Sequence, residues 1–554
     1  MQHPLFEKHR ATLDRALEAI ATRGYWTPYP ESPSPRNYGE GAAAAGKAAF
    51  DALANQRFPL TQPGTTGQVG AERSPYGIKL GITYPKADID GLMAAIETAQ
   101  GSWRKAGPEA WVGVSLEILD RINKASFEIA NAVMHTTGQA FVMAFQAGGP
   151  HAQDRGLEAV AYAWDQMRRV PGQATWEKPQ GKGDPVRMEK QFRVVPRGVA
   201  LVIGCSTFPT WNGYPAIFAS LATGNAVIVK PHPNAILPLA ITVRIAREVL
   251  RDAGFDPNVV TLVAHDAGDD TAQGLALRPE VKIVDFTGST ANGRWLEEHA
   301  RQAQVYTEKA GVNQVIVDST DDLKGLVRNL AFSLALYTGQ MCTAPQNVYL
   351  PADGVQTDEG HKTVAEVASG IGAAFGKLLG DDARAVELLG GVVNDGVLSR
   401  LEGSGSRGTV LVESRAVRHP TYDGAVVRTP TLIGLSAADA DVYESECFGP
   451  VAYLIETSGT DESIDLFRST VLRRGAMTAA VYSTAPAVVE QMRSAALDAG
   501  VALSENLTGS VFVNQSAAFS DFHGTGANPA ANASFTDTAF VANRFRMVQS
   551  RRHV

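Results

Sequence analysis

An alternation of short apolar runs with helical stretches, beginning at Pro196, constrains the fold of this 554-residue chain more than any other feature. Helical patterns at residues 214–223, 237–253 and 271–276 separate the apolar runs. The runs, each of strand length, are residues 199–204, 226–229, 259–263 and 281–286. Strands that alternate with helices at this spacing predict a parallel sheet in a doubly wound α/β layer, which binds ligands at the carboxyl ends of its strands.

A second alternation of the same kind begins past Gly311. Its apolar runs are residues 314–317, 348–350, 409–413, 451–456, 477–482 and 510–514, and its longest helical patterns cover 323–336 and 364–379. Because 554 residues are too many for one hydrophobic core, these runs predict a second α/β domain.

The segments outside the two alternations predict an N-terminal extension, a helical region and an arm. Residues 4–22 and 41–53 are predicted helices of the extension, which packs onto the main body. Helical patterns then cover 89–100, 108–131 and 151–170, and the polar stretch after them predicts a protruding hairpin. The predicted domains are residues 1–75 (extension), 76–177 with 196–309 (first α/β domain), 310–532 (second α/β domain), and 178–195 with 533–554 (arm).

Composition and charge exclude several classes of protein. The net charge of -8 lacks the basic footprint of a nucleic-acid-binding protein. The longest apolar runs are too short to span a membrane, and residues 1–23 have no apolar signal-peptide core. Three cysteines, Cys205, Cys342 and Cys447, are an odd number in a long chain, which favours a reducing compartment over a disulfide framework. We therefore expect a cytoplasmic protein without nucleic-acid or membrane partners.

Cys342 has the surroundings of a nucleophile. It lies between the helical pattern 323–336 and the strand-like run 348–350, among glycine and small polar residues. Small neighbours leave the sulfur accessible, and nearby backbone N–H groups can stabilise a thiolate or a developing oxyanion. The alternative is that Cys342 is a small buried hydrophobic residue, as many free cysteines are.

Two segments of the first alternation offer groups for an anion or a ribose, although no G-x-G-x-x-G motif follows any strand. Residues 285–293 end a strand and open a helix at Gly288-Ser289, where free N–H groups can bind an anion. An ordinary capped helix explains the same residues. Lys230 ends the run 226–229 and is placed either to bind a ribose or simply to face solvent.

Four segments, taken together, resemble the aldehyde dehydrogenase superfamily in order and spacing. They are residues 196–209, 222–231, 286–290 and 446–450. Gly339-Gln340-Met341-Cys342 then resembles the catalytic cysteine segment of that family, and Glu308 matches its glutamate, 34 residues before Cys342. The resemblance covers residues 87–514 and identifies the chain as a member of the superfamily.

The resemblance implies a mechanism with roles for particular residues. The Cys342 thiolate attacks the aldehyde, hydride passes to a nicotinamide, and Glu308 activates the water that hydrolyses the resulting thioester. The family supplies an asparagine as an oxyanion donor, but Thr207 occupies that position here. Either Thr207 or the nearby Asn212 is therefore the predicted donor. Trp211, Tyr214, Met341 and Thr343 are predicted to wall the substrate tunnel, with core packing as the alternative for Trp211 and Tyr214.

For the cofactor, the resemblance implies NADP or NAD and no metal. The implied contacts are Lys230 to the ribose, Gly288 and Ser289 to the pyrophosphate, and Glu446 and Phe448 to the nicotinamide riboside. Many NAD-preferring members carry a glutamate three residues after the lysine, whereas this chain has Pro233. Since proline places no negative charge against a 2′-phosphate, NADP is predicted to be used at least as well as NAD.

The N-terminal extension and the chain length resemble the PaaN-type branch, which is named for phenylacetic acid degradation. That branch implies an aldehyde of aromatic catabolism, a CoA-linked semialdehyde, as substrate. The predicted arm matches the family's oligomerisation strands and implies a homodimer or a higher homo-oligomer. Two alternatives remain open, a CoA-acylating aldehyde dehydrogenase and a catalytically idle relative that serves in binding.

Overall fold

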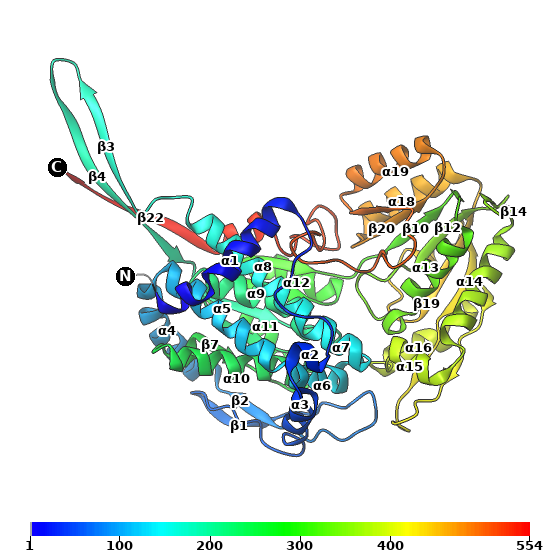
Figure 1. Cartoon of the computed structure of the whole chain (residues 1–554), viewed down its shortest axis with the longest axis horizontal. Coiled ribbons are helices and arrows are strands. Elements are labelled where there is room, and N and C mark those ends of the chain that lie inside the picture. Colours follow the sequence, from blue (N-terminus) through cyan, green and yellow to red (C-terminus); the bar gives the residue numbers. More distant parts are fainter. Residues whose placement is uncertain (1–2) are drawn as a thin grey trace.

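Two large sheets organise the chain, and the structure, a computed structural model, describes residues 3–554 (Figure 1). The strands of the first sheet are β5 (Val199–Ile203), β6 (Ala226–Lys230), β7 (Val260–Leu262), β8 (Val281–Thr287) and β9 (Gln304–Glu308). They are all parallel, in the order β7–β6–β5–β8–β9. The strand order reverses at β5, which confirms the predicted doubly wound layer and puts its ligand-binding switch point at the carboxyl ends of β5 and β8.

Helices cover both faces of the first sheet. They are α4 (Ile89–Ala106), α5 (Pro108–Lys124), α6 (Ser126–Thr137), α7 (Phe141–Gly148), α8 (Pro150–Met167), α9 (Pro209–Ala222), α10 (Leu237–Asp252), α11 (Thr271–Ala276) and α12 (Thr290–His299). Along β5, Ala200 and Val202 face the core that contains α5, α8, α9 and α10, whereas Val199 and Leu201 face α4, α11 and α12. Burial on both faces explains why these strands consist of continuous apolar residues.

One helix boundary was predicted wrongly in this region. The pattern at 108–131 predicted a single helix, but α5 ends at Lys124 and α6 begins at Ser126. The Ser126 hydroxyl donates to the carbonyl of Asn123 at 2.7 Å, a local bond that competes with continuation of the helix.

The second sheet has seven strands. They are β10 (Gln314–Val317), β12 (Asn347–Pro351), β15 (Thr409–Val412), β18 (Thr431–Ser436), β19 (Val451–Thr457), β20 (Ala479–Tyr482) and β21 (Leu503–Glu505), in the order β15–β18–β19–β12–β10–β20–β21. Only β15 is antiparallel to its neighbour within this sheet of described strands. The second alternation thus folds as the predicted α/β layer.

Helices also cover both faces of the second sheet. They are α13 (Leu323–Ala335), α14 (Val364–Leu379), α15 (Asp382–Leu389), α16 (Asp395–Glu402), α17 (Ala440–Tyr443), α18 (Thr460–Arg474) and α19 (Pro486–Ala499). Val315 and Val317 of β10 pack toward α13 and α14, while Ile316 packs toward α18 and α19. Two small sheets complete this part, β11 (Ser319–Thr320) with β13 (Val355–Thr357) and β14 (Gly360–Lys362), and β16 (Ala416–Val417) with β17 (Val427–Arg428).

The predicted strand at residues 510–514 is wrong. This segment forms turns, and its polar groups bind the neighbouring loop and helix instead of a strand. The carbonyl of Asn514 accepts from Thr343 Oγ1 at 2.8 Å, and Asn514 Nδ2 donates to the carbonyl of Ser333 at 3.1 Å. An apolar run alone could not reveal this, because the run faces the cavity described below.

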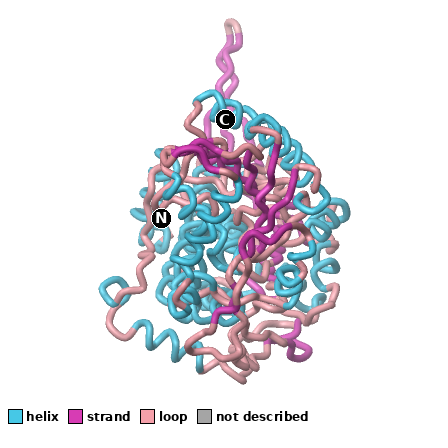
Figure 2. The backbone as a smooth tube through the Cα atoms, turned by 90° about the vertical axis from the view of Figure 1, so that its right-hand side faces the viewer, coloured by secondary structure: helices cyan, strands magenta, loops and turns pink. Residues whose placement is uncertain are grey.

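The arm is an antiparallel three-stranded sheet that projects from the body (Figures 1 and 2). It contains β3 (Gln173–Gln180), β4 (Gly183–Pro196) and β22 (Phe545–His553), in the order β22–β4–β3. The predicted start at residue 178 is wrong, because the alternating residues from Gln173 already pair with β4. Residues 533–544 also lie outside the arm, since α20 (Thr538–Ala542) packs against α8 in the body.

The N-terminal extension packs onto the first layer, as predicted. It contains α1 (Pro4–Thr22), α2 (Pro35–Tyr38), α3 (Ala42–Asp51) and β1 (Thr65–Val69), which pairs with β2 (Tyr84–Ala87). Helix α1 has the predicted bounds and buries Phe6 against Trp164 of α8, with ring centroids 4.7 Å apart. None of the helices in residues 3–554 is long and apolar enough to cross a membrane.

Candidate active site

Cys342 is held in a sharply turned segment between the two layers. Tyr337, Thr338 and Gly339 all have positive φ, at 52°, 55° and 63°. A Cβ at Gly339 would lie 2.4 Å from the carbonyl oxygen of Gly449, so only glycine fits there. Asn313 Nδ2 donates to the carbonyl of Cys342 at 2.7 Å. These contacts fix the direction of the cysteine, and such strained turns are typical of functional sites.

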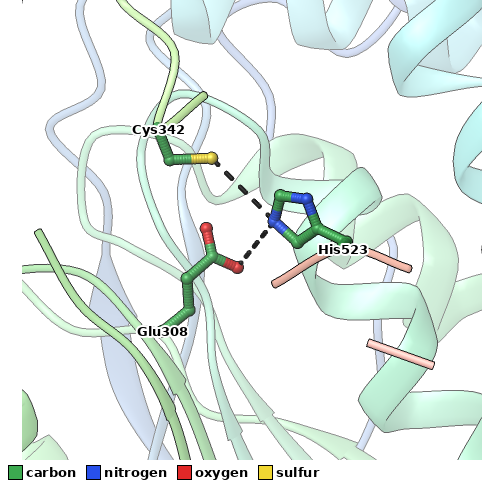
Figure 3. Close-up of side chains that lie close together, drawn as sticks. All are labelled: Glu308, Cys342 and His523. Atoms are coloured by element: carbon green, nitrogen blue, oxygen red, sulfur yellow. Dashed lines mark hydrogen bonds and ion pairs between the residues drawn. The ribbon is translucent and has the colours of Figure 1, made fainter. Parts of the chain in front are cut away.

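Three side chains from distant parts of the chain meet at this turn (Figure 3). Glu308 ends β9, Cys342 follows the turn after α13, and His523 lies in the loop that precedes α20. His523 Nε2 lies 3.1 Å from Glu308 Oε2 and 4.0 Å from Cys342 Sγ. One side-chain atom of each residue lies within 4.8 Å of the others. The tertiary structure thus brings together the two predicted residues, Cys342 and Glu308, and adds a histidine.

The protonation of this group follows from its surroundings. Burial opposes ionisation of Glu308, but the His523 ring and several hydrogen bonds outweigh it and lower the pKa of this carboxyl below its ordinary value. Burial, and then the Glu308 charge, raise the pKa of the Cys342 thiol well above its ordinary value. At rest the site therefore contains a carboxylate beside a protonated thiol.

The two candidate oxyanion donors lie in different places. Asn212, in the first turn of α9, lines the same cavity as Cys342, and its Nδ2 donates to Glu308 Oε2 at 2.9 Å. Thr207 is half-buried, and its carbonyl accepts from Gln139 Nε2 at 2.8 Å. Thr207 is not among the residues of 3–554 that line the cavity. The position of Asn212 favours it as the donor.

His523 was not found by the sequence analysis. It is 181 residues from Cys342 and 215 from Glu308, and its local sequence Asp521-Phe522-His523-Gly524 has no metal or triad spacing. A single histidine in a loop carries no signal of its own. The place of His523 in the site becomes visible only in the tertiary structure, where its loop contacts Glu308 at the end of β9.

The predicted ribose ligand, Lys230, ends β6 and is 5% exposed. Burial lowers the pKa of its ammonium to about 8, which the Asp269 charge partly opposes. In residues 3–554 no carboxylate lies within 4.0 Å of this ammonium. A buried cation without an ion-pair partner, at the carboxyl end of a parallel strand, fits a hydrogen-bond acceptor of a bound cofactor.

Gly288 and Ser289 lie between β8 and α12, at the same sheet edge as Lys230. The Ser289 hydroxyl accepts from the N–H of Asn292 at 3.3 Å and so caps α12. A Cβ at Gly288 would lie 2.7 Å from the Phe286 ring, which explains the glycine. The ordinary capping role and the anion-binding role are both compatible with this geometry.

Glu446 and Phe448 approach from the loop between α17 and β19. Solvent reaches the Glu446 side chain, yet the protein around it raises the pKa of this carboxyl to about 7, mainly through desolvation, and the Glu308 charge adds to this. Phe448 is half-buried, and its carbonyl accepts from Arg400 Nε at 2.9 Å. Together with Lys230 and Ser289 at the edge of the first sheet, Glu446 and Phe448 fit a dinucleotide that lies across the two layers.

A cavity of about 550 Å³ leads to Cys342, His523 and Asn212. Its apolar lining residues include Trp26, Val142, Met143, Phe208, Trp211, Phe332, Leu336, Met341 and Phe512, and Thr343 lines it as well. Trp26 belongs to the N-terminal extension, for which the sequence predicted only packing onto the main body. The predicted wall residue Tyr214 is not there: it is fully buried, and its hydroxyl bonds to Thr242 at 2.9 Å. Tyr214 is therefore a core residue, which was the alternative to a wall residue in the sequence analysis.

A doubly wound layer with a cysteine and a carboxylate close together at its edge is the arrangement of a dehydrogenase-like α/β enzyme. Residues 80–524 match the aldehyde dehydrogenase family. A crystal structure of an NAD-dependent aldehyde dehydrogenase from Burkholderia multivorans is 63% identical, with a TM-score of 0.99 and 100% of both chains covered. The chain belongs to the aldehyde dehydrogenase family, and it is an oxidoreductase of that family.

More distant relatives differ in their named substrates. An N-succinylglutamate 5-semialdehyde dehydrogenase from Burkholderia cenocepacia is 27% identical over 440 residues, which cover 77% of this chain and 84% of that protein. A benzaldehyde dehydrogenase [NAD(+)] from Pseudomonas putida is 24% identical over 392 residues, which cover 68% of this chain and 73% of that protein. These relatives share the family but differ in their named substrates, so the substrate of this chain has to be inferred from its own cavity.

Proposed function

We propose that this enzyme oxidises an aldehyde to a carboxylic acid through a thioester on Cys342, with NAD or NADP as the hydride acceptor. The observation that carries the proposal is that the Cys342 sulfur, which lines a cavity of about 550 Å³, lies within 4.8 Å of the Glu308 carboxylate. An idle relative would have no need to keep these two groups together in a buried site.

The residues divide the reaction between them. The Cys342 thiolate forms a C–S bond with the carbonyl carbon, and the Asn212 amide, with the Cys342 N–H, stabilises the resulting oxyanion. The bound nicotinamide supplies the oxidising chemistry, because it accepts a hydride. Glu308 Oε1, a buried oxygen without a hydrogen-bond partner in residues 3–554, then takes a proton from the water that attacks the thioester. Cys342 leaves as a thiolate, and the acid is released.

The lining of the cavity favours an uncharged aromatic or other apolar aldehyde. Aromatic rings and methionines lie among its lining residues, and carboxylates outnumber cations among the charged ones. The Arg155 guanidinium at the cavity is already bound to Glu158 at 2.9 Å and to Ser516 Oγ at 3.0 Å. A hydrogen bond from His151 lowers the pKa of Glu31 to about 2, so this cavity residue stays negative. Such a wall repels a substrate that carries a carboxylate or a phosphate.

The CoA-linked semialdehyde of phenylacetic acid degradation, which the sequence predicts from the PaaN-type branch, stays a prediction. Its acyl part could enter the cavity, but its anionic nucleotide would lie near Glu31, Glu387 and Asp521. The CoA-acylating alternative is disfavoured by Glu308, because an enzyme in which the CoA thiol attacks the thioester needs no base to activate water.

The preference for NADP also stays a prediction. Burial lowers the pKa of His232 to about 4, which leaves Lys230 as the cation beside Pro233.

We also propose a homo-oligomer in the cytoplasm. Strand β3 lies at the edge of the projecting arm with one side unpaired within the described chain, and such an edge pairs readily with a second copy. All three cysteines are free thiols, which suits a reducing compartment. Light scattering measures the oligomer directly.

The test is an aldehyde panel assayed with three variants. Wild-type protein should turn over benzaldehyde-like substrates with a higher kcat/KM than succinic semialdehyde or a CoA-linked semialdehyde. Cys342→Ala should lose activity, while Glu308→Gln should give a burst of reduced cofactor followed by slow release. Cys447→Ala, which changes a buried cysteine away from the cavity, should keep most activity.

Two results would overturn the proposal. Turnover by Cys342→Ala would exclude the thioester route. Production of an acyl-CoA, with Glu308→Gln restored to wild-type turnover by added CoA, would show an acylating enzyme instead.

A further inference from the structure

His523 contacts both groups that the proposed reaction uses. Its Nε2 lies 3.1 Å from Glu308 Oε2 and 4.0 Å from Cys342 Sγ, and its side chain is buried (Figure 3). The ring edge packs on Trp211 with centroids 4.5 Å apart. The backbone exchanges two hydrogen bonds with Phe535, at 2.9 and 3.3 Å. The ring is therefore held in place from both sides.

The contact with Glu308 determines where a hydrogen of the ring lies. The lowered pKa of Glu308 keeps this group ionised, and an ionised carboxylate can only accept hydrogen bonds. His523 Nε2 therefore carries a hydrogen and donates it. Asn212 Nδ2 donates to the same oxygen, so Oε2 is fully engaged while Oε1 stays without a partner.

A second negative charge at this site needs compensation. The attacking thiolate of Cys342 would form within reach of the Glu308 carboxylate, and the two anions repel each other in a buried site. Burial raises the cost of the thiolate further. The histidine is the group that touches both atoms on which these charges lie.

Within residues 3–554 no other cation takes this place. Arg155 of α8 is bound to Glu158 and to the carbonyl of Asp521, and its guanidinium lies 5.4 Å from the centroid of the Trp211 ring. The remaining titratable groups that face the site oppose a thiolate or are neutral: Glu446 before β19, Asp521 in the loop of His523, and the buried thiol of Cys205 after β5.

We propose that His523 is a third catalytic residue, the hydrogen-bond partner of Cys342: its Nε2–H binds the Glu308 carboxylate at rest and the Cys342 thiolate during attack. The inference rests on the proposed function. In the ionisation step the S–H bond breaks, the proton passes to the Glu308 carboxylate, and Glu308 then releases it to water. No electrons are transferred in this step. Glu308 is again ionised and ready for the hydrolytic step.

The experiment measures the rate at which iodoacetamide labels Cys342 from pH 5 to pH 10, with mass spectrometry to separate the three cysteines. In His523→Phe the labelling rate at pH 7 should fall about tenfold or more, because the thiolate loses its hydrogen-bond donor. Phenylalanine keeps an aromatic ring against Trp211 but has no N–H to donate. His299→Phe, the same change at an exposed histidine of α12, should leave the rate unchanged.

An unchanged labelling rate in a folded His523→Phe would overturn the inference and would leave a structural role for the ring. If that variant does not fold, ¹⁵N NMR of the wild-type ring decides. A hydrogen on Nε2 near pH 7 supports the proposal, and a ring protonated only on Nδ1 contradicts it. Failure of the proposed function is distinguishable, because then Cys342→Ala would remain active whatever the labelling rate of His523→Phe.

Discussion

At the residue scale, Asn212 is placed better for catalysis than Thr207, which occupies the position of the family's asparagine. It donates to the Glu308 carboxylate at 2.9 Å and lines the cavity beside Cys342. Its carbonyl oxygen lies 3.7 Å from the Cys205 sulfur, which holds the amide with its Nδ2 directed toward Glu308. The chain thus combines a cysteine, a glutamate, an amide and a histidine in one group beside the cavity.

We expect Asn212→Ala to lower kcat on the order of 10²-fold, because the loss of one oxyanion donor typically has this effect. Thr207→Val, which keeps the shape and removes only the hydroxyl, should lower kcat less than about tenfold. Steady-state kinetics on one good aldehyde compares the two. A larger effect of Thr207→Val would return the oxyanion role to the position that the family alignment gives.

At the element scale, the start of α10 depends on a buried glutamate from the N-terminal extension. Glu72 accepts hydrogen bonds from the first N–H groups of this helix, at Ile236 and, at 3.0 Å, at Leu237. The Tyr84 hydroxyl also donates to Glu72. The carboxyl takes the place of a cap that Ile236 cannot provide itself. Burial outweighs these bonds and raises the pKa of Glu72 to about 7.

This raised pKa predicts a stability that falls as pH rises. The pKa of Glu72 is about 7 in the folded protein and 4.5 ordinarily, so its contribution is complete below pH 4.5 and is lost as pH rises through 7. The difference corresponds to at most roughly 3 kcal/mol. Glu72→Gln keeps an acceptor and does not titrate, so its Tm should fall less than that of the wild type between pH 5 and pH 8.

Thermal unfolding followed by circular dichroism measures this effect. Glu97→Gln, on the exposed surface of α4, is the matched control and should follow the wild type. Equal pH slopes for wild type and Glu72→Gln would contradict the assignment.

At the scale of the whole molecule, the N-terminal extension completes the substrate cavity and holds the loop of His523. The Arg23 guanidinium donates to the carbonyl of Ser520 at 2.9 Å and lies 4.0 Å over the Phe522 ring. Trp26 packs on Phe519 with centroids 5.5 Å apart. Residues near both ends of the chain therefore build one wall, next to the catalytic group.

We expect Trp26→Ala to raise the KM of an aromatic aldehyde about tenfold, equivalent to about 1.4 kcal/mol of lost contact, with a smaller change in kcat. Arg15→Ala, on the exposed side of α1, is the control within the extension and should change neither constant. Initial rates over a range of aldehyde concentrations give both values. An unchanged KM in Trp26→Ala would mean that the substrate binds away from the extension.

Much of this protein follows from the sequence alone. The alternation from Pro196 onward determines the parallel layers, because buried parallel strands must be continuous apolar runs separated by helices. The bounds of α1 follow from its apolar spacing and from the proline at its start. Cys342 and Glu308 could be predicted because their local segments match a family pattern in order and spacing.

Only the tertiary structure decided the rest. His523, Asn212 and Trp26 reach the cavity from segments that lie far apart in the chain, and no local pattern encodes such a contact. Tyr214 looked like a wall residue from its neighbours, but its helix turns it into the core, where Thr242 binds its hydroxyl. The run 510–514 has the composition of a strand, but its polar groups bind the loop of Cys342 and α13 instead. Local sequence determines the periodicity of an element, whereas the packing of distant elements determines which face is buried and which side chains share a site.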